Sequence, residues 1–290
     1  MSANNKASWK SLIQYPLPHH ALSRVVHWLT RLRLGPLTTA AIKQFVKGFK
    51  VDLSLAVREE ARDYDSFNDF FTRALKVSAR PVDGSEKSVV SPVDGAVSQA
   101  MAIEDGRIFQ AKGHSYTAAE LLGSEEDAEM FSNGSFATIY LSPRDYHRIH
   151  MPLDGELSMV RHVPGRLFSV NTRTTAEVPG LFARNERVVT IFDTPAGKLA
   201  VVMVGAIFVG SIETVWAGEI TPPRGRDLKT WHYGTASGRD GIRIAKGKEL
   251  GRFNMGSTVI LLAEQGRLSW DDIMQPGAAL KMGQRIGKLT

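Results

Sequence analysis

Gly256, Ser257 and Thr258 stand directly before an aliphatic run, Val259 to Leu262, which predicts a buried strand. Glycine tolerates backbone angles closed to other residues, so the Ser257 hydroxyl can be turned toward the Gly256 carbonyl carbon. Attack at that carbon would cut the chain between Gly256 and Ser257. An isolated Gly-Ser-Thr step is more often an ordinary start of a strand, so the rest of the chain must support the self-cleavage hypothesis.

Two histidines lie close together in a second unusual stretch, Tyr140 to Pro152. Ser142 can cap a helix and Pro143 can occupy its first position, which predicts a single helical turn. His147 and His150 are three residues apart, so this turn would place both imidazoles on one face. The alternative is that they are structural histidines with backbone partners.

Asp94, His150 and Ser257 together supply the residue types of an Asp-His-Ser triad. Such a triad fits either a serine hydrolase or a self-processing protein. An α/β-hydrolase carries Gly-x-Ser-x-Gly on a strand-to-helix turn, whereas Ser257 precedes a predicted strand. The pattern therefore favours self-processing.

The composition narrows the chemistry further. The chain has 290 residues and no cysteine, which excludes disulfides, thiolate metal sites and cysteine nucleophiles. Its eight histidines show no spacing of the HExxH kind, so no metal site is predicted. The formal net charge is +6, and residues 1–51 hold eight of the 36 Lys and Arg residues but no Asp or Glu. The basic character is therefore a property of the N-terminal segment.

This basic segment predicts two amphipathic helices separated by Gly35 and Pro36. Their apolar stripes are Leu22, Val25, Val26, Leu29 and Leu32 in a helix from about residue 20 to 34, and Ile42, Phe45, Val46 and Phe49 in the next. The stripes either pack on the rest of the protein or enter the headgroup region of a membrane, where Lys and Arg meet anionic lipid. The absence of acidic residues favours the membrane surface.

No segment of the sequence is long enough to span a bilayer. The longest apolar run, residues 199–209, falls short of the ~20 residues that a spanning helix needs, and it predicts a core strand. The N-terminus shows no hydrophobic segment of a signal peptide, so we expect a cytosolic protein that meets the membrane from that side.

The remaining pattern predicts the fold class. Residues 65–75 predict a third helix, and short β-rich runs separated by Gly, Pro and Asp-Gly turns follow to the C-terminus. A Pro-x-Asp-Gly-x-x-Ser frame occurs at Pro92–Ser98 and again at Pro152–Ser158, which indicates a duplicated β unit. We predict an α+β protein: an N-terminal helical membrane-binding region over residues 1–80, then a β-rich, duplicated barrel-sandwich-like catalytic domain over residues 81–290.

These motifs resemble the motif series of the bacterial phosphatidylserine decarboxylases. The matching segments are Ser66–Arg73, Ser91–Gly95, Tyr140–Pro152, Pro164–Asn171 and Phe253–Thr258, and the resemblance runs from about residue 10 to 265. One departure is visible, because the family's usual Leu-Gly-Ser-Thr has Met255 in the first place here. Leucine and methionine are close in volume, so we expect at most a modest change in processing rate.

The resemblance implies a specific processing reaction. Asp94 would orient His150, which would take the proton of Ser257 as its hydroxyl attacks the Gly256 carbonyl. The resulting ester would break by elimination, and hydrolysis with loss of ammonia would leave a pyruvoyl group, the covalent cofactor, in place of Ser257. The products would be a beta chain, 1–256, and an alpha chain, 257–290.

The resemblance also implies the activity. The enzyme would be a pyruvoyl-dependent lyase of phospholipid biosynthesis that converts phosphatidylserine to phosphatidylethanolamine and carbon dioxide. The substrate amine would form a Schiff base with the pyruvoyl carbonyl, which acts as an electron sink. His147 would protonate the carbon that loses carbon dioxide. The expected partners are phosphatidylserine, the anionic cytoplasmic face of the cell membrane as a peripheral protein, the two cleavage fragments as a heterodimer, and a second copy as a homodimer.

Other classes of protein remain as alternatives. A pyruvoyl-dependent decarboxylase of a soluble amino acid would have little need of basic amphipathic helices. A processed β-rich binding module would cleave but release no carbon dioxide, and a serine hydrolase would stay in one piece. Nucleic-acid binding is not predicted, because the basic residues lie on amphipathic helices without interleaved stacking aromatics.

Overall fold

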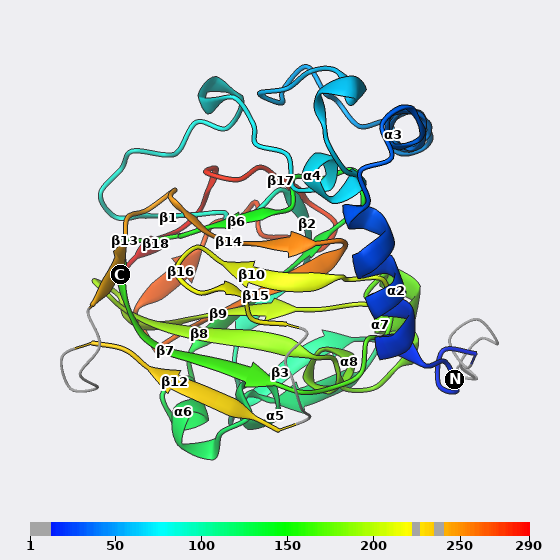
Figure 1. Cartoon of the computed structure of the whole chain (residues 1–290). Coiled ribbons are helices and arrows are strands. Elements are labelled where there is room, and N and C mark those ends of the chain that lie inside the picture. Colours follow the sequence, from blue (N-terminus) through cyan, green and yellow to red (C-terminus); the bar gives the residue numbers. More distant parts are fainter. Residues whose placement is uncertain (1–12, 222–226, 235–240) are drawn as a thin grey trace.

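The computed structural model describes residues 13–221, 227–234 and 241–290 (Figure 1). The helices in these ranges are α2 His19–Arg31, α3 Pro36–Phe49, α4 Phe67–Phe71, α5 Ala118–Leu122, α6 Glu125–Glu129, α7 Thr172–Glu177 and α8 Leu181–Arg184, with 3₁₀ turns at Ala61–Asp63 and Val77–Ala79. The strands are β1 Ser88–Val90, β2 Gly95–Ala102, β3 Arg107–Ala111, β4 His114–Thr117, β5 Ser135–Leu141, β6 Arg148–His150, β7 Gly155–Val163, β8 Arg187–Thr194, β9 Gly197–Val204, β10 Ser211–Thr214, β11 Gly218–Glu219, β12 Lys229–His232, β13 Ile242–Ile244, β14 Glu249–Asn254, β15 Ser257–Ala263, β16 Leu268–Trp270, β17 Ala279–Leu280 and β18 Arg285–Leu289. The α+β class is confirmed.

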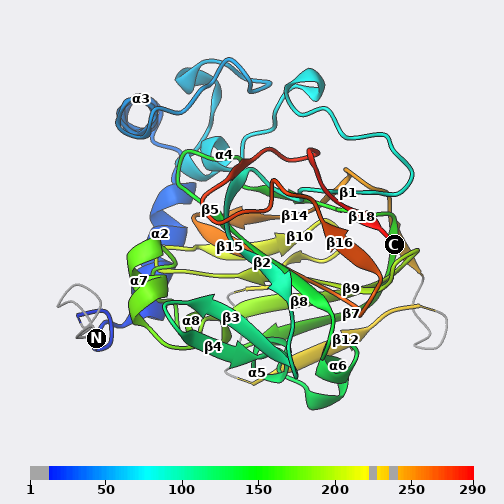
Figure 2. The same cartoon turned by 180° about the vertical axis from the view of Figure 1, so that it is seen from behind.

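The strands form a sandwich-like body of antiparallel sheets. The largest sheet has nine strands in the order β12-β7-β8-β9-β15-β5-β2-β17, with β13 also paired to β7. A four-stranded sheet, β11-β10-β14-β6, contributes Ile149, Ile212, Leu250 and Phe253 to the same hydrophobic core as the large sheet. Figure 2 shows α5 and α6 at the end of this body that lies far from α3.

β15 is the central strand of the large sheet. Val259–Ala263 are all buried, and this stretch pairs with β5 on one side and β9 on the other. An unbroken aliphatic run is what a strand covered on both faces requires. The predictions of strands at residues 259–262 and within 199–209 are confirmed, since β9 occupies most of the second segment.

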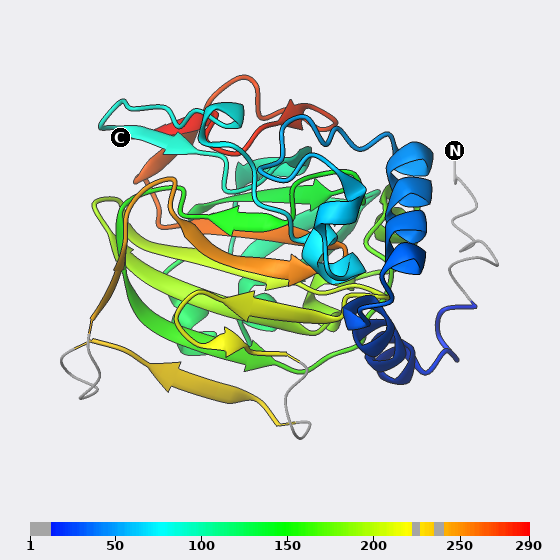
Figure 3. The same cartoon turned by 45° about the horizontal axis from the view of Figure 1, so that its top comes forward.

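The two N-terminal helices form as predicted but pack differently. They lie along one edge of the body (Figure 3). α3 buries Ile42 against an aromatic cluster that includes Phe70 and Phe71, as its apolar stripe predicts. In α2 the buried residues are His19 and Ser23, so its polar side faces the protein. Within the described residues, the structure contains no helix with the length and apolar character needed to cross a membrane.

Two predicted local structures are wrong. The helix expected over residues 65–75 covers only Phe67–Phe71, because Thr72 already leaves helical geometry and Leu75 forms a β-bridge with Ala56. Ser66 caps this short helix, since the Asp69 amide donates to Ser66 Oγ at 3.1 Å.

The expected helical turn that carries both histidines is also absent. Ser142–Asp145 form a tight turn, closed by Asp145 N donating to the Ser142 carbonyl at 2.9 Å, and β6 follows. His150 therefore lies in a strand, where pairing with β14 replaces a helical turn.

Both copies of the predicted repeat begin a strand of the large sheet. β2 starts at Gly95 and β7 starts at Gly155, so in each copy the strand begins at the glycine of the Asp-Gly step. A Cβ on Gly95 would lie 2.5 Å from the Tyr140 carbonyl oxygen, so this position of the first copy requires glycine.

Candidate active site

The junction between β14 and β15 has an unusual backbone. Met255 has φ 92° and Gly256 has φ 34°, and both values lie in the left-handed region. Glycine adopts such angles freely, whereas a methionine there is strained and must be held by its surroundings. Apart from its two chain neighbours, no described residue has an atom within 4 Å of a Cβ built on Gly256, so the space on this side of Gly256 is open. The backbone of Ser257 begins β15 opposite Leu141, and its side chain lies outside the described atoms.

Asn254 fixes the chain immediately before this junction. Its carbonyl accepts from the Gly210 amide at 2.6 Å, and its Nδ2 donates to Ser211 Oγ at 2.6 Å. Its Oδ1 accepts from Asn68 Nδ2 of α4 at 3.0 Å. Asn254 is 1% exposed, so it is held from two sides in a dry environment. Asn254 and Asn68 lie in segments that resemble the family, but the sequence did not predict that they meet, because these contacts join segments far apart in the chain.

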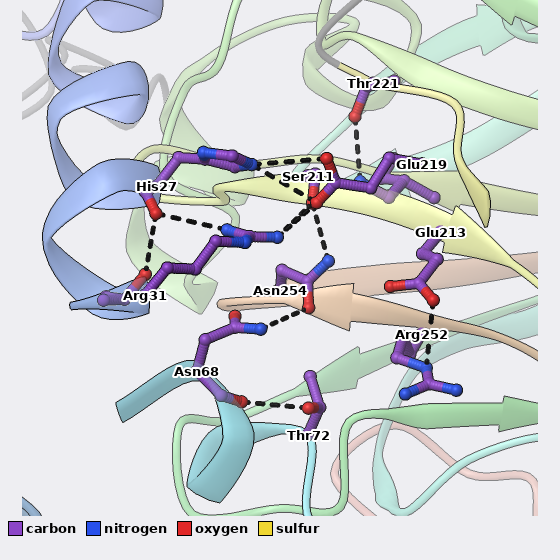
Figure 4. Close-up of polar contacts among 12 residues, drawn as sticks. His27, Arg31, Asn68, Thr72, Ser211, Glu213, Glu219, Thr221, Arg252 and Asn254 are labelled. Atoms are coloured by element: carbon purple, nitrogen blue, oxygen red, sulfur yellow. Dashed lines mark hydrogen bonds and ion pairs between the residues drawn. The ribbon is translucent and has the colours of Figure 1, made fainter. Parts of the chain in front are cut away.

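A polar network continues from Asn254 to α2 (Figure 4). Ser211 Oγ donates to Glu219 Oε1 at 2.7 Å. Arg31 pairs with Glu219 and also donates to Ser211 Oγ at 3.2 Å, while His27 Nε2 lies 3.3 Å from Glu219. These contacts explain why the polar face of α2 turns inward.

His150 is a buried, oriented imidazole. Its Nδ1 lies 2.8 Å from the Gly247 carbonyl, which can only accept, so Nδ1 carries the hydrogen. Its Nε2 lies 3.1 Å from the Tyr146 hydroxyl and accepts from it. Burial lowers the pKa of His150, while the Gly247 carbonyl, Glu249 and Asp94 act in the opposite direction. Burial raises the pKa of Tyr146 to about 12, so its hydroxyl stays protonated and His150 Nε2 is the basic atom.

Asp94 has a different partner from the one expected. Its carboxylate pairs with the Arg80 guanidinium, through Nε at 2.7 Å and through Nη2, and it accepts from the Met282 amide at 2.9 Å. In the described residues no hydrogen bond joins Asp94 to His150. The Arg80 guanidinium binds both carboxylate oxygens of Asp94. Asp94 therefore influences the pKa of His150 through its charge and without a hydrogen bond.

His147 is completely buried and lies against α4. Its ring stacks on Phe71 with centroids 4.1 Å apart. Within the described part of the chain, neither ring nitrogen has a hydrogen-bond partner of good geometry. Burial, with a smaller effect of Arg73, lowers the pKa of His147 to about 3, although the Pro143 and Ser142 carbonyls oppose this. His147 is therefore neutral at neutral pH.

The two imidazoles do not share one environment. His147 contacts Phe71, whereas His150 contacts Gly247 and Tyr146. His147 is nevertheless tied to the strand that precedes the cleavage junction, because its carbonyl accepts from the Phe253 amide at 3.0 Å.

Known proteins match nearly the whole chain. A family model described as phosphatidylserine decarboxylase matches residues 67–288, and one described as PSD matches residues 9–50. The chain belongs to the phosphatidylserine decarboxylase family. It is 56% identical over 282 residues to the phosphatidylserine decarboxylase proenzyme of Shewanella sp. (strain MR-4), covering 97% of this chain and 96% of that protein. It is 54% identical over 283 residues to the proenzyme of Shewanella putrefaciens, covering 97% and 98%.

In this phosphatidylserine decarboxylase family member, a cleft of about 450 Å³ opens at the end of β5. Tyr140 and Ser142 line it and flank Leu141, the pairing partner of Ser257. The charged lining residues are Lys50, Asp52, Arg73, Arg80, Asp94, Arg144, Asp145 and Lys281, so cations outnumber carboxylates. The sequence carried a signal for four of them, since Arg73, Asp94, Arg144 and Asp145 lie in segments that resemble the family.

Proposed function

We propose that this protein converts phosphatidylserine to phosphatidylethanolamine and carbon dioxide with a pyruvoyl group made from Ser257. The observation that carries the proposal is the junction itself: a strained Met255, an open Gly256 and a serine at the start of the most enclosed strand. Membership of the family and the proenzyme names of its relatives support the same reaction.

Self-cleavage needs a base, a carbonyl and room around them. His150 Nε2 is the proposed base for the Ser257 hydroxyl, with the Gly247 carbonyl holding the ring through Nδ1. The open space beside Gly256 leaves room for its carbonyl carbon to become tetrahedral. The charge of Asp94 favours the protonated ring that forms as His150 accepts the proton.

The two proposed fragments would remain together. Residues 257–290 contribute β15, which pairs with β5 and β9, and β18, which pairs with β1. All three partner strands belong to the fragment 1–256, so cleavage leaves the sheets intact. A homodimer of this cleaved pair stays a prediction, which sedimentation equilibrium would check.

The decarboxylation step uses different residues. A pyruvoyl carbonyl at position 257 would supply the electron sink that ordinary side chains lack, and the open side of the junction suits it. His147 is the proposed donor of a proton to the carbon that loses carbon dioxide, because its neutral ring still carries one N–H in a dry site.

Intact mass spectrometry of the purified protein tests the proposal. We expect two species that divide after Gly256, with a ketone at the start of the smaller one. Ser257→Ala and His150→Ala should remain single chains, whereas His147→Ala should cleave but fail to decarboxylate phosphatidylserine. An unbroken chain with full activity would overturn the pyruvoyl mechanism, and labelling of Ser257 by a fluorophosphonate would point to a hydrolase.

We also propose that α2 and α3 hold the protein on the cytoplasmic face of the cell membrane. Trp28 is 61% exposed and Leu37 is 69% exposed, and Val25, Leu29, Leu34 and Phe49 are exposed as well. Because the polar face of α2 is held by Glu219, its apolar face is free to enter a bilayer.

Liposome sedimentation tests this attachment. Trp28→Ser with Leu37→Ser should weaken binding to anionic vesicles at least about tenfold, because each apolar side chain buried is worth ~1.5–3 kcal/mol. Val77→Ser is a matched control, since Val77 is 96% exposed outside these helices. Equal binding by all three proteins would mean that the helices do not contact lipid.

A further inference from the structure

Arg73 is a buried cation whose hydrogen bonds are incomplete. It follows α4, is 4% exposed, and holds its guanidinium carbon 5.5 Å from the centre of the Phe70 ring. Its Nη2 donates to the Arg144 and Asp145 carbonyls at 3.0 and 3.3 Å. In the parts of the chain that the structure describes, Nε and Nη1 have no partner.

Two other arginines of the described chain, the half-buried Arg80 and the buried Arg187, make more complete sets of contacts. Arg80 pairs with Asp94 and also donates to the Ala79 carbonyl. Arg187 has no acidic partner, and its donors reach the backbone carbonyls of Leu121, Ala183, Asn185 and Glu120. A buried cation with unused donors is costly unless something completes it. The free Nε and Nη1 of Arg73 therefore indicate an anion that the described residues do not supply.

The position of Arg73 identifies the place where this anion would sit. Arg73 lines the cleft at the end of β5, together with Tyr140 and Ser142. The carbonyls that it holds belong to the loop that leads from Leu141, the pairing partner of Ser257, toward His147. Arg73 thus lies in the wall of the space that the substrate must enter if Ser257 becomes the reactive group, with Nε and Nη1 buried within that wall.

We propose that Arg73 binds the phosphate of the phospholipid headgroup. This inference rests on the proposed function. The planar guanidinium suits a phosphate, which accepts two parallel hydrogen bonds. The carboxylate of the substrate fits less well, because decarboxylation removes its charge. An ion pair to it would stabilise the reactant more than the transition state. The phosphate keeps its charge throughout and can anchor reactant and product alike.

Short-chain phosphatidylethanolamine separates the two anions, since it has the phosphate but no carboxylate. Its binding would be measured by calorimetry on the wild-type protein, on Arg73→Gln and on Arg243→Gln. Arg243 does not line the cleft and its side chain is 84% exposed, which makes it the matched control. The KM for phosphatidylserine in detergent micelles and the extent of self-cleavage would be measured on the same three proteins.

We expect Arg73→Gln to cleave itself, to bind phosphatidylethanolamine about tenfold to a hundredfold more weakly, and to show a similar rise in KM. Arg243→Gln should change either constant less than about threefold. A raised KM with unchanged phosphatidylethanolamine binding would assign Arg73 to the carboxylate, and unchanged values of both would remove it from substrate binding. Either result overturns the proposal.

Two further controls keep the test decisive. If Arg73→Gln does not fold, Arg73→Lys replaces it, because lysine keeps the positive charge but lacks the planar guanidinium that forms two parallel hydrogen bonds. The proposal then requires Arg73→Lys to bind phosphatidylethanolamine more weakly than the wild-type protein does. If the wild-type protein binds phosphatidylethanolamine but releases no carbon dioxide from phosphatidylserine, the proposed function fails. The comparison of binding constants still decides the role of Arg73.

Discussion

β15 has two parts of opposite physical character. Its interior, Val259–Ala263, is buried on both faces and paired on both sides. Its start follows Met255 and Gly256, which both have positive φ angles, and Gly256 has open space on its Cβ side. Backbone strain persists only where the surroundings fix the chain on both sides. The regular half of the strand therefore supports the irregular half, and the Gly256–Ser257 bond, the proposed cleavage site, lies next to a buried backbone that is paired on both sides.

The largest expected effect comes from breaking the regular half. Leu261→Ala should reduce the free energy of unfolding by ~2–5 kcal/mol, because a fully buried leucine leaves a cavity in a strand that cannot collapse. Urea denaturation in a Ser257→Ala background measures this in uncleaved chains. Val77→Ala, at an exposed position, should change the same quantity by less than about 0.5 kcal/mol. Equal losses for the two variants would contradict the rigid-support argument.

The next largest effect is expected at Asn254, whose hydrogen bonds hold the chain immediately before the irregular half of β15. Asn254→Ala removes hydrogen bonds to Ser211 and Asn68 and should slow self-cleavage about tenfold or more. A time course of fragment appearance measures the rate. Asn171→Ala, which removes the cap of α7, should leave that rate unchanged. Normal cleavage by Asn254→Ala would mean that the positive φ angles need no such support.

The next prediction concerns how the free energy of unfolding depends on pH. The interior of β15 carries no titrating group, whereas the surroundings of the junction include His147. Unfolded His147 binds a proton below about pH 6.5, whereas burial keeps the folded pKa at about 3. The unfolded state therefore binds more protons between these values, so stability falls as pH drops through this window, by up to ~1.4 kcal/mol per unit. Above pH 6.5 His147 has no such effect.

His147→Phe tests this linkage, because it keeps a ring against Phe71 but cannot titrate. In the Ser257→Ala background, urea denaturation at pH 5.0, 6.0 and 7.5 should show a shallower pH dependence for His147→Phe than for its parent. Parallel curves would show that His147 is protonated in the folded protein.

The smallest effect is expected at Met255. Met255→Leu restores the family's usual residue and should change the cleavage rate less than about threefold, because the two side chains are close in volume and the backbone angle stays the same. The same fragment time course measures it. A change beyond tenfold would mean that the side chain, and not the backbone, sets the reactivity of the junction.

Local patterns in the sequence determined several features of this protein. The aliphatic run predicted the buried strand that begins at Ser257, and helical spacing predicted α2 and α3. The motifs that contain Asp94 and His150 predicted the family. These features depend on neighbouring residues and on side-chain types, which are present in the chain before it folds.

Only the tertiary structure decided how the parts meet. It paired Asp94 with Arg80, turned the polar face of α2 toward Glu219, and left Arg73 with free donors on the wall of a cleft. It also placed His150 in a strand, because β6 pairs with β14 and a helical turn could not form these hydrogen bonds. Contacts of this kind join residues far apart in the chain, and periodicity within a short window carries no information about them.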